Sequence, residues 1–225
     1  MTINRPYHGP RELPQIVPVF PLSGVLLLPR GDLPLNIFEP RYLKMIDDVL
    51  AGDRMIGIIQ PAIGAQGPDE REVPALADIG CVGRVTALQE TGDDRYLITV
   101  TGISRFRVVE ELEVTTPYRQ CRITTEPFGE DFTASYGEDA VDRQKLLATF
   151  RAFLDANDME TDWESVNRAS NETLVNALSM LSPYGPREKQ ALLEADDLNT
   201  RAEVLIAVTE MALARDSDDF GPSLQ

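Results

Sequence analysis

The stretch PLNIFEPRYLKMIDDVL, residues 34–50, decides the fold. It reads as an extended segment up to Phe38 and then meets Pro40, whose fixed φ angle and missing amide hydrogen suit a first helical turn. Apolar residues follow at helical spacing, at Leu43, Ile46 and Leu50. The stretch therefore predicts an extended strand that turns sharply into a helix.

The corner of this stretch has two interpretations, and the sequence leaves both open. In the first, Phe38 staples the helix to the sheet, and Glu39 and Arg41 brace the corner as an ion pair. In the second, the corner is exposed and Phe38 and Tyr42 bind a partner, because aromatic residues and arginine are favoured anchors of binding surfaces. Phe38, Glu39, Arg41 and Tyr42 are thus the candidate residues for binding a polypeptide or another protein.

The sequence around the corner predicts a β-rich first half. Eight of the 16 prolines fall in the first 40 residues, which favours extended segments over long helices. Polar and apolar residues alternate in CVGRVTALQ and YRQCRITTE, as in half-buried strands, and ETGDDRY reads as a hairpin turn. Many short strands predict a small closed or partly closed barrel. The predicted strands are Ile16–Phe20, Val25–Leu28, Leu35–Phe38, Met55–Gln60, Gly80–Gln89, Tyr96–Thr101, Ser104–Val109 and Tyr118–Thr125.

The second half predicts helices, because prolines become sparse and alanine, leucine, glutamate and arginine dominate. Residues 127–137 are the predicted linker, and the tail RDSDDFGPSLQ, residues 215–225, is expected to fray. Thr200 and Glu203 have the spacing of a capping box. Together the two halves predict an α+β fold. The predicted helices are Glu138–Asn157, Asn171–Leu181, Pro186–Ala195 and Thr200–Arg215.

The charge of the chain excludes several kinds of partner. The formal net charge is −16, and residues 127–225 hold 20 acidic and 8 basic side chains. Because nucleic acids and anionic membranes bind proteins through their phosphates, this balance argues against both. The longest apolar run, Val204–Val208, is far short of the roughly 20 residues that cross a bilayer, and residues 1–15 lack the apolar core of a secretory signal. We therefore expect a cytoplasmic protein.

Few residues can support catalysis or bind a metal. His8 is the single histidine and lies in a proline-rich arm, which excludes an HExxH motif and a credible Cys/His couple. The motifs GxxxxGK[ST], GxGxxG and GxSxG do not occur, and GAQGPDE, residues 64–70, reads as a surface loop. We expect no catalytic residue, no cofactor and no metal.

The cysteines and the paired carboxylates have simple structural interpretations. Cys81 and Cys121 lie in strand-like segments and are expected to be reduced core thiols. Adjacent carboxylates are expected to point in different directions on a solvated surface. These pairs are Asp47 with Asp48, Asp93 with Asp94, and Asp196 with Asp197.

Two other functions stay open at this point. A hydrolase that used Cys81, Cys121 or a carboxylate cluster would need a strongly perturbed pKa in a cleft. An RNA-binding protein would need a basic face, whereas the simpler expectation is that strand arginines pair with nearby carboxylates. The arginines in question are Arg84, Arg95, Arg105, Arg107, Arg119 and Arg122.

The segment VPVFPLSGVLLLPRGDLPLNIFEPRYLKMIDDVL, residues 17–50, resembles the opening of the Lon N-terminal domain, also called the Lon substrate-binding domain. Members of that family reach an LPL-I-FEPRY corner and run into a helix. IGCVGRVTAL resembles their next strand, and YLITVTGISRFRVVE resembles their hairpin with a Gly-x-x-Arg-Phe turn. LSMLSPYGPREKQALLEADDLNTRAEVL is similar to their helical portion, so the likeness runs from about residue 14 to residue 215.

The resemblance implies a PUA-like β-barrel over residues 1–128 and an α-helical bundle over residues 137–225. Full-length Lon proteases continue into an ATPase module and a Ser/Lys peptidase domain. This sequence has no Walker motif, and no serine is credibly paired with one of its three lysines. The resemblance therefore implies a stand-alone, peptidase S16-like recognition module that is not itself an enzyme. It would bind an unfolded polypeptide or a specific protein, as a monomer or as a homo-oligomer.

Overall fold

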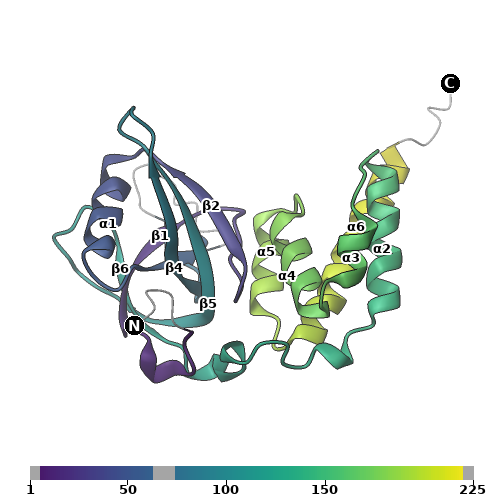
Figure 1. The fold of residues 1–225 in the computed structure, drawn as a ribbon, viewed down its shortest axis with the longest axis horizontal. Coiled ribbons are helices and arrows are strands. Elements are labelled where there is room, and N and C mark those ends of the chain that lie inside the picture. The colour runs from purple at the N-terminus through teal and green to yellow at the C-terminus, as the bar shows by residue number, and fades with distance from the viewer. Residues whose placement is uncertain (1–5, 63–73, 220–225) are drawn as a thin grey trace. The chain divides into compact units, whose positions relative to one another are not determined.

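The computed structural model describes residues 6–62 and 74–219 (Figure 1). The chain forms two compact units. Unit 1 comprises residues 1–134 and 183–193, and unit 2 comprises residues 135–182 and 194–225. None of the helices in the described ranges is long and apolar enough to cross a membrane. The predicted loop at residues 64–70 lies outside the described residues.

Unit 1 is built on one six-stranded sheet. Its strands lie in the order β2-β5-β4-β3-β1-β6, and β6 also pairs with β5, which closes five of the strands into a barrel. β1 and β3 are parallel, and the other pairs are antiparallel. Its elements are η1 (Pro10–Glu12), β1 (Ile16–Pro21), β2 (Asp32–Ile37), α1 (Pro40–Leu50), β3 (Met55–Ile59), β4 (Ile79–Glu90), β5 (Tyr96–Glu111), β6 (Gln120–Thr124), η2 (Glu126–Phe132) and α5 (Pro186–Glu194).

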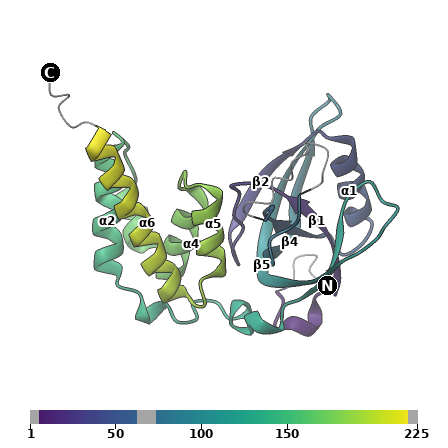
Figure 2. The ribbon, with the colours of Figure 1, turned by 180° about the vertical axis from the view of Figure 1, so that it is seen from behind.

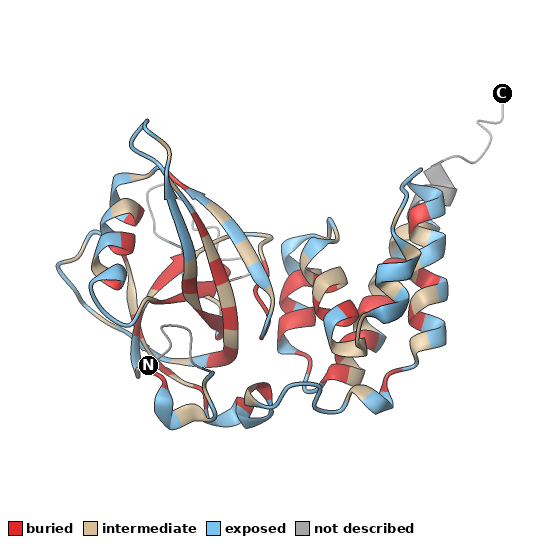
Figure 3. Cartoon of the chain, in the orientation of Figure 1, coloured by how far each residue is buried: buried red, intermediate tan, exposed pale blue. Residues whose placement is uncertain are grey.

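The barrel core is formed by the inward-facing residues of the strands, as the red bands of Figure 3 show. Phe106, Val17, Val19 and Cys121 are fully buried in it. The buried face of α1 is formed by four residues, Tyr42, Met45, Ile46 and Val49. The predicted face of Leu43, Ile46 and Leu50 is therefore only partly right, because Leu50 at the end of the helix is 37% exposed.

Unit 2 is helical, and α2 and α6 lie side by side in both views (Figures 1 and 2). Arg201 on α6 donates from Nη1 to Asn176 Oδ1 on α4 at 3.1 Å, which ties a third helix to the pair. The first part of the tail predicted to fray is helical, and residues 220–225 lie outside the described part of the chain. The elements are η3 (Glu138–Ala140), α2 (Arg143–Ala156), α3 (Trp163–Arg168), α4 (Asn171–Leu181) and α6 (Leu198–Asp219).

The predicted strand Val25–Leu28 is wrong. Its leucines are buried, but the segment is assigned no secondary structure and makes no strand pairing. The residues that follow it contact β5 instead, since Arg30 N donates to Gly102 O and Gly102 N donates to Gly31 O. A Cβ on Gly102 would lie 2.0 Å from the carbonyl oxygen of Leu28, so only glycine permits this approach.

The predicted turn between Tyr96–Thr101 and Ser104–Val109 is also wrong. The two segments form one strand, β5, which is sixteen residues long. Gly102 looks like a turn residue in the sequence, but it sits inside the strand where its pairing with β4 shifts register near Gly83. A strand glycine often marks such a close approach of backbone rather than a reversal of the chain.

In unit 2, α4 has the predicted ends, but the other helices differ from the prediction. The predicted helix Glu138–Asn157 is interrupted, because Asp142 accepts a hydrogen bond from Lys145 N and begins α2 afresh. The sequence did not predict α3, a single short helix capped by Asp162. α6 begins two residues before the predicted capping box, and Asp197 accepts the hydrogen bond from Thr200 N.

Candidate functional site

The corner between β2 and α1 is built by Pro40, which begins the helix, and by Glu39, which precedes it in an extended conformation. Glu39 makes no capping hydrogen bond with its side chain. Its carboxylate accepts from Arg41 Nε at 2.9 Å, and Arg41 Nη2 lies 2.8 Å from the same oxygen. The predicted ion pair is confirmed, and both of its side chains remain accessible to solvent.

Tyr42 secures the corner from within. Its side chain is 6% exposed, and its ring centroid lies 4.0 Å from that of Phe20 on β1. The guanidinium of Arg41 lies 4.5 Å from the Tyr42 ring centroid. Burial raises the pKa of the Tyr42 hydroxyl. Tyr42 therefore packs in the barrel wall and presents little surface to a partner.

Phe38 is exposed, and the prediction that it staples the helix to the sheet is wrong. Its side chain is 59% exposed, whereas Ile37 before it is buried. Successive side chains of a strand point to opposite faces, so the inward position of Ile37 turns Phe38 outward. Tyr42, one turn into α1, makes the contact with the sheet that the sequence had assigned to Phe38.

Exposed neighbours extend the surface around Phe38. The guanidinium of Arg95 lies 5.8 Å from the Phe38 ring centroid. Leu97, which is 43% exposed, pairs with Asn36 on β2, so it lies on the same outer face as Phe38 and diagonal to it. Phe38, Leu97, Arg95, Arg41 and Glu39 form what we call the corner surface, an apolar pair bordered by charged side chains.

The C-terminal half of α1 is held by two tyrosines from the barrel. Tyr96 Oη donates to Asp47 Oδ1 at 3.0 Å, and Tyr118 Oη donates to Asp48 Oδ2 at 2.7 Å. Hydrogen bonds from Lys44 and Tyr118 hold the pKa of Asp48 below its usual value, and burial together with this bond raises the pKa of Tyr118 to about 12. The adjacent carboxylates thus point to different partners, as predicted.

Arg105 of the Gly-x-x-Arg-Phe segment makes the most buried ion pair of unit 1. Its guanidinium donates from Nε and Nη2 to the Asp131 carboxylate at 3.0 Å each, and its backbone N–H donates to Asp131 Oδ2 at 2.8 Å. Both side chains are less than 10% exposed. Arg105 also lies 4.8 Å from the ring of Phe128, so the pair fastens η2 to β5.

A second buried network fastens α5 to the barrel. Gln60 Nε2 donates to Gln190 Oε1 at 3.0 Å and to the Pro186 carbonyl, and Gln190 Nε2 donates to the Ile79 carbonyl. Gly24 N in turn donates to Gln60 Oε1 at 2.9 Å. Because these polar groups satisfy one another away from water, they fix α5 on unit 1 in a defined register.

The cysteines have no reactive surroundings. Cys81 and Cys121 are free and buried, as predicted. Burial, followed by the nearby Glu111 carboxylate, raises the pKa of the Cys121 thiol to about 11. A nucleophilic cysteine needs the opposite shift. Within residues 6–62 and 74–219, no group of three His, Cys, Asp or Glu side chains is placed to hold a metal ion.

Most of the strand arginines pair with carboxylates. Arg95 pairs with Asp93, Arg105 with Asp131, Arg119 with Glu111 and Arg122 with Glu110. Arg84 stacks on the ring of Tyr7, and Arg107 is exposed. These contacts neutralise most of the face that an RNA ligand would require, in agreement with the simpler of the two expectations.

The comparisons with known proteins agree with the fold. The family model of the ATP-dependent protease La (LON) substrate-binding domain matches residues 16–209. Lon protease 2 of Myxococcus xanthus is 30% identical over 205 residues, which cover 87% of this chain and 23% of that protein. Lon protease of Anaeromyxobacter dehalogenans is 32% identical over 115 residues, or 50% of this chain and 13% of that one. The chain thus spans about a quarter or less of these curated relatives.

Two solved structures show the same fold. A Lon N-terminal domain protein from Xanthomonas campestris superposes with a TM-score of 0.60 at 21% identity, covering 85% of this chain and 97% of that one. The N-terminal domain of the Mycobacterium avium complex Lon protease gives a TM-score of 0.61 at 18% identity, covering 87% and 98%. With the family match over most of its length, this chain belongs to the Lon substrate-binding domain family.

Proposed function

We propose that this chain recognises polypeptide, as an unfolded segment or as part of a specific protein partner, and carries out no bond chemistry of its own. The family to which it belongs is described as substrate-binding, and the relatives that it matches are named Lon proteases. The matched segments cover 23% and 13% of those two proteins, and a solved structure with the same fold is the N-terminal domain of another Lon protease. We expect it to act in the cytoplasm, alone or as a homo-oligomer.

The observation that carries the proposal is the exposure of Phe38. The Phe38 side chain is 59% exposed, so a partner that covers it removes apolar surface from water, which favours binding. Burial of apolar surface contributes about 25 cal/mol per Å², and aromatic and arginine side chains often dominate binding energies. Leu97 enlarges the apolar part of the corner surface, and Arg41 and Arg95 can orient a peptide through its carbonyl groups.

Tyr42 has a supporting part in this proposal. Because its ring contacts both Phe20 and Arg41, it fixes the start of α1 and therefore the position of Phe38 and Arg41. A surface held in this way loses little conformational freedom when a ligand binds. Of the four residues nominated by the sequence, we assign direct contact to Phe38, Glu39 and Arg41 and positioning to Tyr42.

The test is a titration of the chain with a fluorescently labelled, reduced and carboxymethylated protein that stays unfolded, followed by anisotropy. Phe38→Ala is expected to weaken binding by about tenfold or more, since that loss corresponds to one strong anchor residue. Leu181→Ala is the matched control, because Leu181 is 82% exposed on α4 and lies outside the corner surface. The proposal fails when the unaltered chain binds neither this protein nor any of a panel of unfolded proteins, or when the two variants bind alike.

A thiol titration tests the hydrolase alternative. Because the pKa of Cys121 is raised to about 11 and both cysteines are buried, neither is expected to react with a chromogenic disulfide at pH 8 in the native protein. Both are expected to react after unfolding in urea. One rapidly reacting thiol in the native chain would revive a cysteine-dependent activity.

A further inference from the structure

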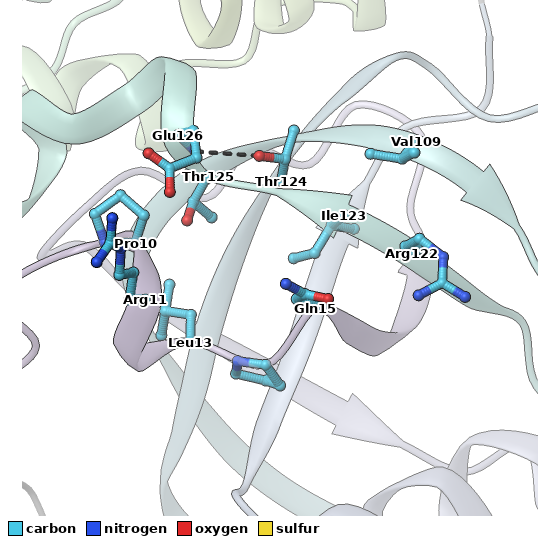
Figure 4. Close-up of a pocket in the computed structure, with 11 residues that line it drawn as sticks. Pro10, Arg11, Leu13, Gln15, Val109, Arg122, Ile123, Thr124, Thr125 and Glu126 are labelled. Carbon is cyan, nitrogen blue, oxygen red and sulfur yellow. Dashed lines mark hydrogen bonds between the residues drawn. The ribbon is translucent and has the colours of Figure 1, made fainter.

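Unit 1 has a pocket of about 380 Å³ between the N-terminal arm and strand β6 (Figure 4). Its volume falls in the range of about 300–1,000 Å³ that small-ligand sites occupy. No residue of the corner surface lines it. Its lining includes Leu13, Val109, Arg122, Ile123, Thr125 and Glu126.

The floor of the pocket is apolar. Leu13 and Ile123 are 8% and 4% exposed, and Pro10 and Pro14 flank them on the arm. Val109 is 59% exposed and also lines the pocket, at the end where Figure 4 shows Arg122. This floor suits an aliphatic side chain, which would remove both its own surface and that of Val109 from water.

Thr125 supplies a hydroxyl to the lining of the pocket. The residue is 5% exposed, and its side chain makes no capping hydrogen bond to η2. Threonine before a helical turn normally accepts from an amide two or three residues on, but Pro127 has no N–H, and Phe128 N donates to the backbone oxygen of Thr125 instead. A hydroxyl that lines the pocket and does not cap the helical turn can donate a hydrogen bond to a ligand or accept one from it.

The charges around the pocket are divided between its two ends. Figure 4 shows Arg11 and Glu126 near Pro10, whereas Arg122 lies at the other end beside Val109. Arg122 Nε lies 3.4 Å from Glu110 Oε2, a long contact, and its two terminal nitrogens make no hydrogen bond to the residues that the structure describes. A planar guanidinium with two available nitrogens is suited to bind a carboxylate.

We propose that this pocket binds a short polypeptide segment that places an aliphatic side chain on Leu13 and Ile123 and a neighbouring carboxylate on Arg122. The Thr125 hydroxyl would hydrogen-bond to a polar atom of the same segment. The carboxylate comes from an acidic side chain or from a chain end. This inference rests on the proposed function, because it assumes that the chain binds polypeptide, and it adds the chemistry of a second subsite.

The experiment uses the full chain and three labelled octapeptides of glycine and serine, followed by fluorescence anisotropy. The first contains leucine beside aspartate and has an amidated end, the second ends in leucine with a free carboxylate, and the third contains leucine beside asparagine and is amidated. At least one of the first two is expected to bind about tenfold more tightly than the third, and their order identifies the source of the carboxylate.

Two variants locate the binding. Thr125→Val keeps the shape of the side chain and removes its hydroxyl, and Arg122→Gln removes the guanidinium. Each is expected to weaken the better peptide by about tenfold. Thr99→Val on β5 and Arg187→Gln on α5 are matched controls outside the pocket and are expected to bind as the unaltered chain does.

The outcomes separate this inference from the proposed function. Thr125→Val removes a hydroxyl that makes no capping bond to η2, so its unfolding midpoint is expected to lie close to that of the unaltered chain, and weaker binding then reports on the pocket. If the unfolded protein binds but the peptides do not discriminate, or if the pocket variants bind like their controls, this inference is wrong and the proposed function stands. If no polypeptide binds at all, both fail.

Discussion

At the scale of single residues, the alternation of side chains along β2 decides which aromatic residue of the corner is buried and which one faces solvent. Ile37 points inward, Phe38 outward, and Tyr42 returns to the core one helical turn later. The sequence brought these residues together correctly, and it predicted the Glu39–Arg41 ion pair. It could not assign the exposed aromatic, because a strand of six residues that ends at a proline corner has too few alternations to fix its inward face.

The difference between the two aromatic residues can be measured as stability. Phe38→Ala is expected to lower the free energy of unfolding by less than about 1 kcal/mol, because the side chain is exposed. Tyr42→Ala is expected to cost about 3–5 kcal/mol, because it leaves a cavity against Phe20. Urea unfolding followed by circular dichroism checks both values. A large loss in Phe38→Ala would mean that this ring is buried in solution.

The buried ion pair between Arg105 and Asp131 makes a second prediction at this scale. Removing one partner leaves the other charge buried, so Arg105→Met and Asp131→Leu are each expected to cost about 3–5 kcal/mol. The double variant is expected to cost less than the sum of the two, and a double-mutant cycle in urea measures the difference. Strict additivity would show that the two side chains do not interact in solution.

At the scale of elements, the sequence predicted the strands and helices that local patterns determine. It missed the features that depend on contacts between distant parts of the chain. The positions of β1, β3 and β6 and the limits of α4 follow from residues within each element. The single long β5 and the unpaired Val25–Leu28 do not, because both depend on the approach of Leu28 to Gly102 from a distant part of the chain. The pocket was also missed, since its lining comes from the N-terminal arm, β5 and the end of β6, which only the folded chain brings together.

The start of α6 gives a pH-dependent prediction. Hydrogen bonds from Thr200 hold the pKa of Asp197 below its usual value, so its carboxylate stabilises the folded chain above the unfolded pKa of about 3.9. That contribution is lost as the pH falls below this value through the folded pKa. Asp197→Ala is expected to cost about 1 kcal/mol at pH 7.

Asp197→Asn is the matched control for this helix start. Asparagine also accepts the hydrogen bond from Thr200 N but does not titrate, so this variant is expected to retain most of the stability at pH 7. Its unfolding free energy is expected to fall less between pH 5 and pH 2 than that of the unaltered chain. Equal slopes in that interval would show that Asp197 does not contribute to the acid sensitivity.

At the scale of the whole molecule, the net charge of −16 and the pairing of strand arginines with carboxylates both argue against RNA binding. A filter-binding assay with single-stranded RNA is expected to show no retention at about 50 mM salt, where electrostatic binding is strong. The variant Arg107→Glu, which reverses the charge of an exposed strand arginine, is expected to behave identically. Retention that falls with rising salt would instead support an RNA-binding role.

The chain divides into its two units after residue 134, and α5 belongs to the unit of the barrel rather than to that of the other helices. Its helical pattern alone could not reveal this, because the partners that fix it, Gln60 and Ile79, lie more than 100 residues earlier. Whether residues 1–128 and 137–225 fold independently stays a prediction.

The hydrogen bond between Gln60 and Gln190 joins residues 130 positions apart, with a consequence for synthesis on the ribosome. At typical translation speeds, Gln190 is added about 6 to 26 s after Gln60. During that interval the nascent barrel has all six of its strands for part of the time but lacks the helix that completes its polar network. The last step in maturing the first unit therefore waits for a segment that is made after most of the second.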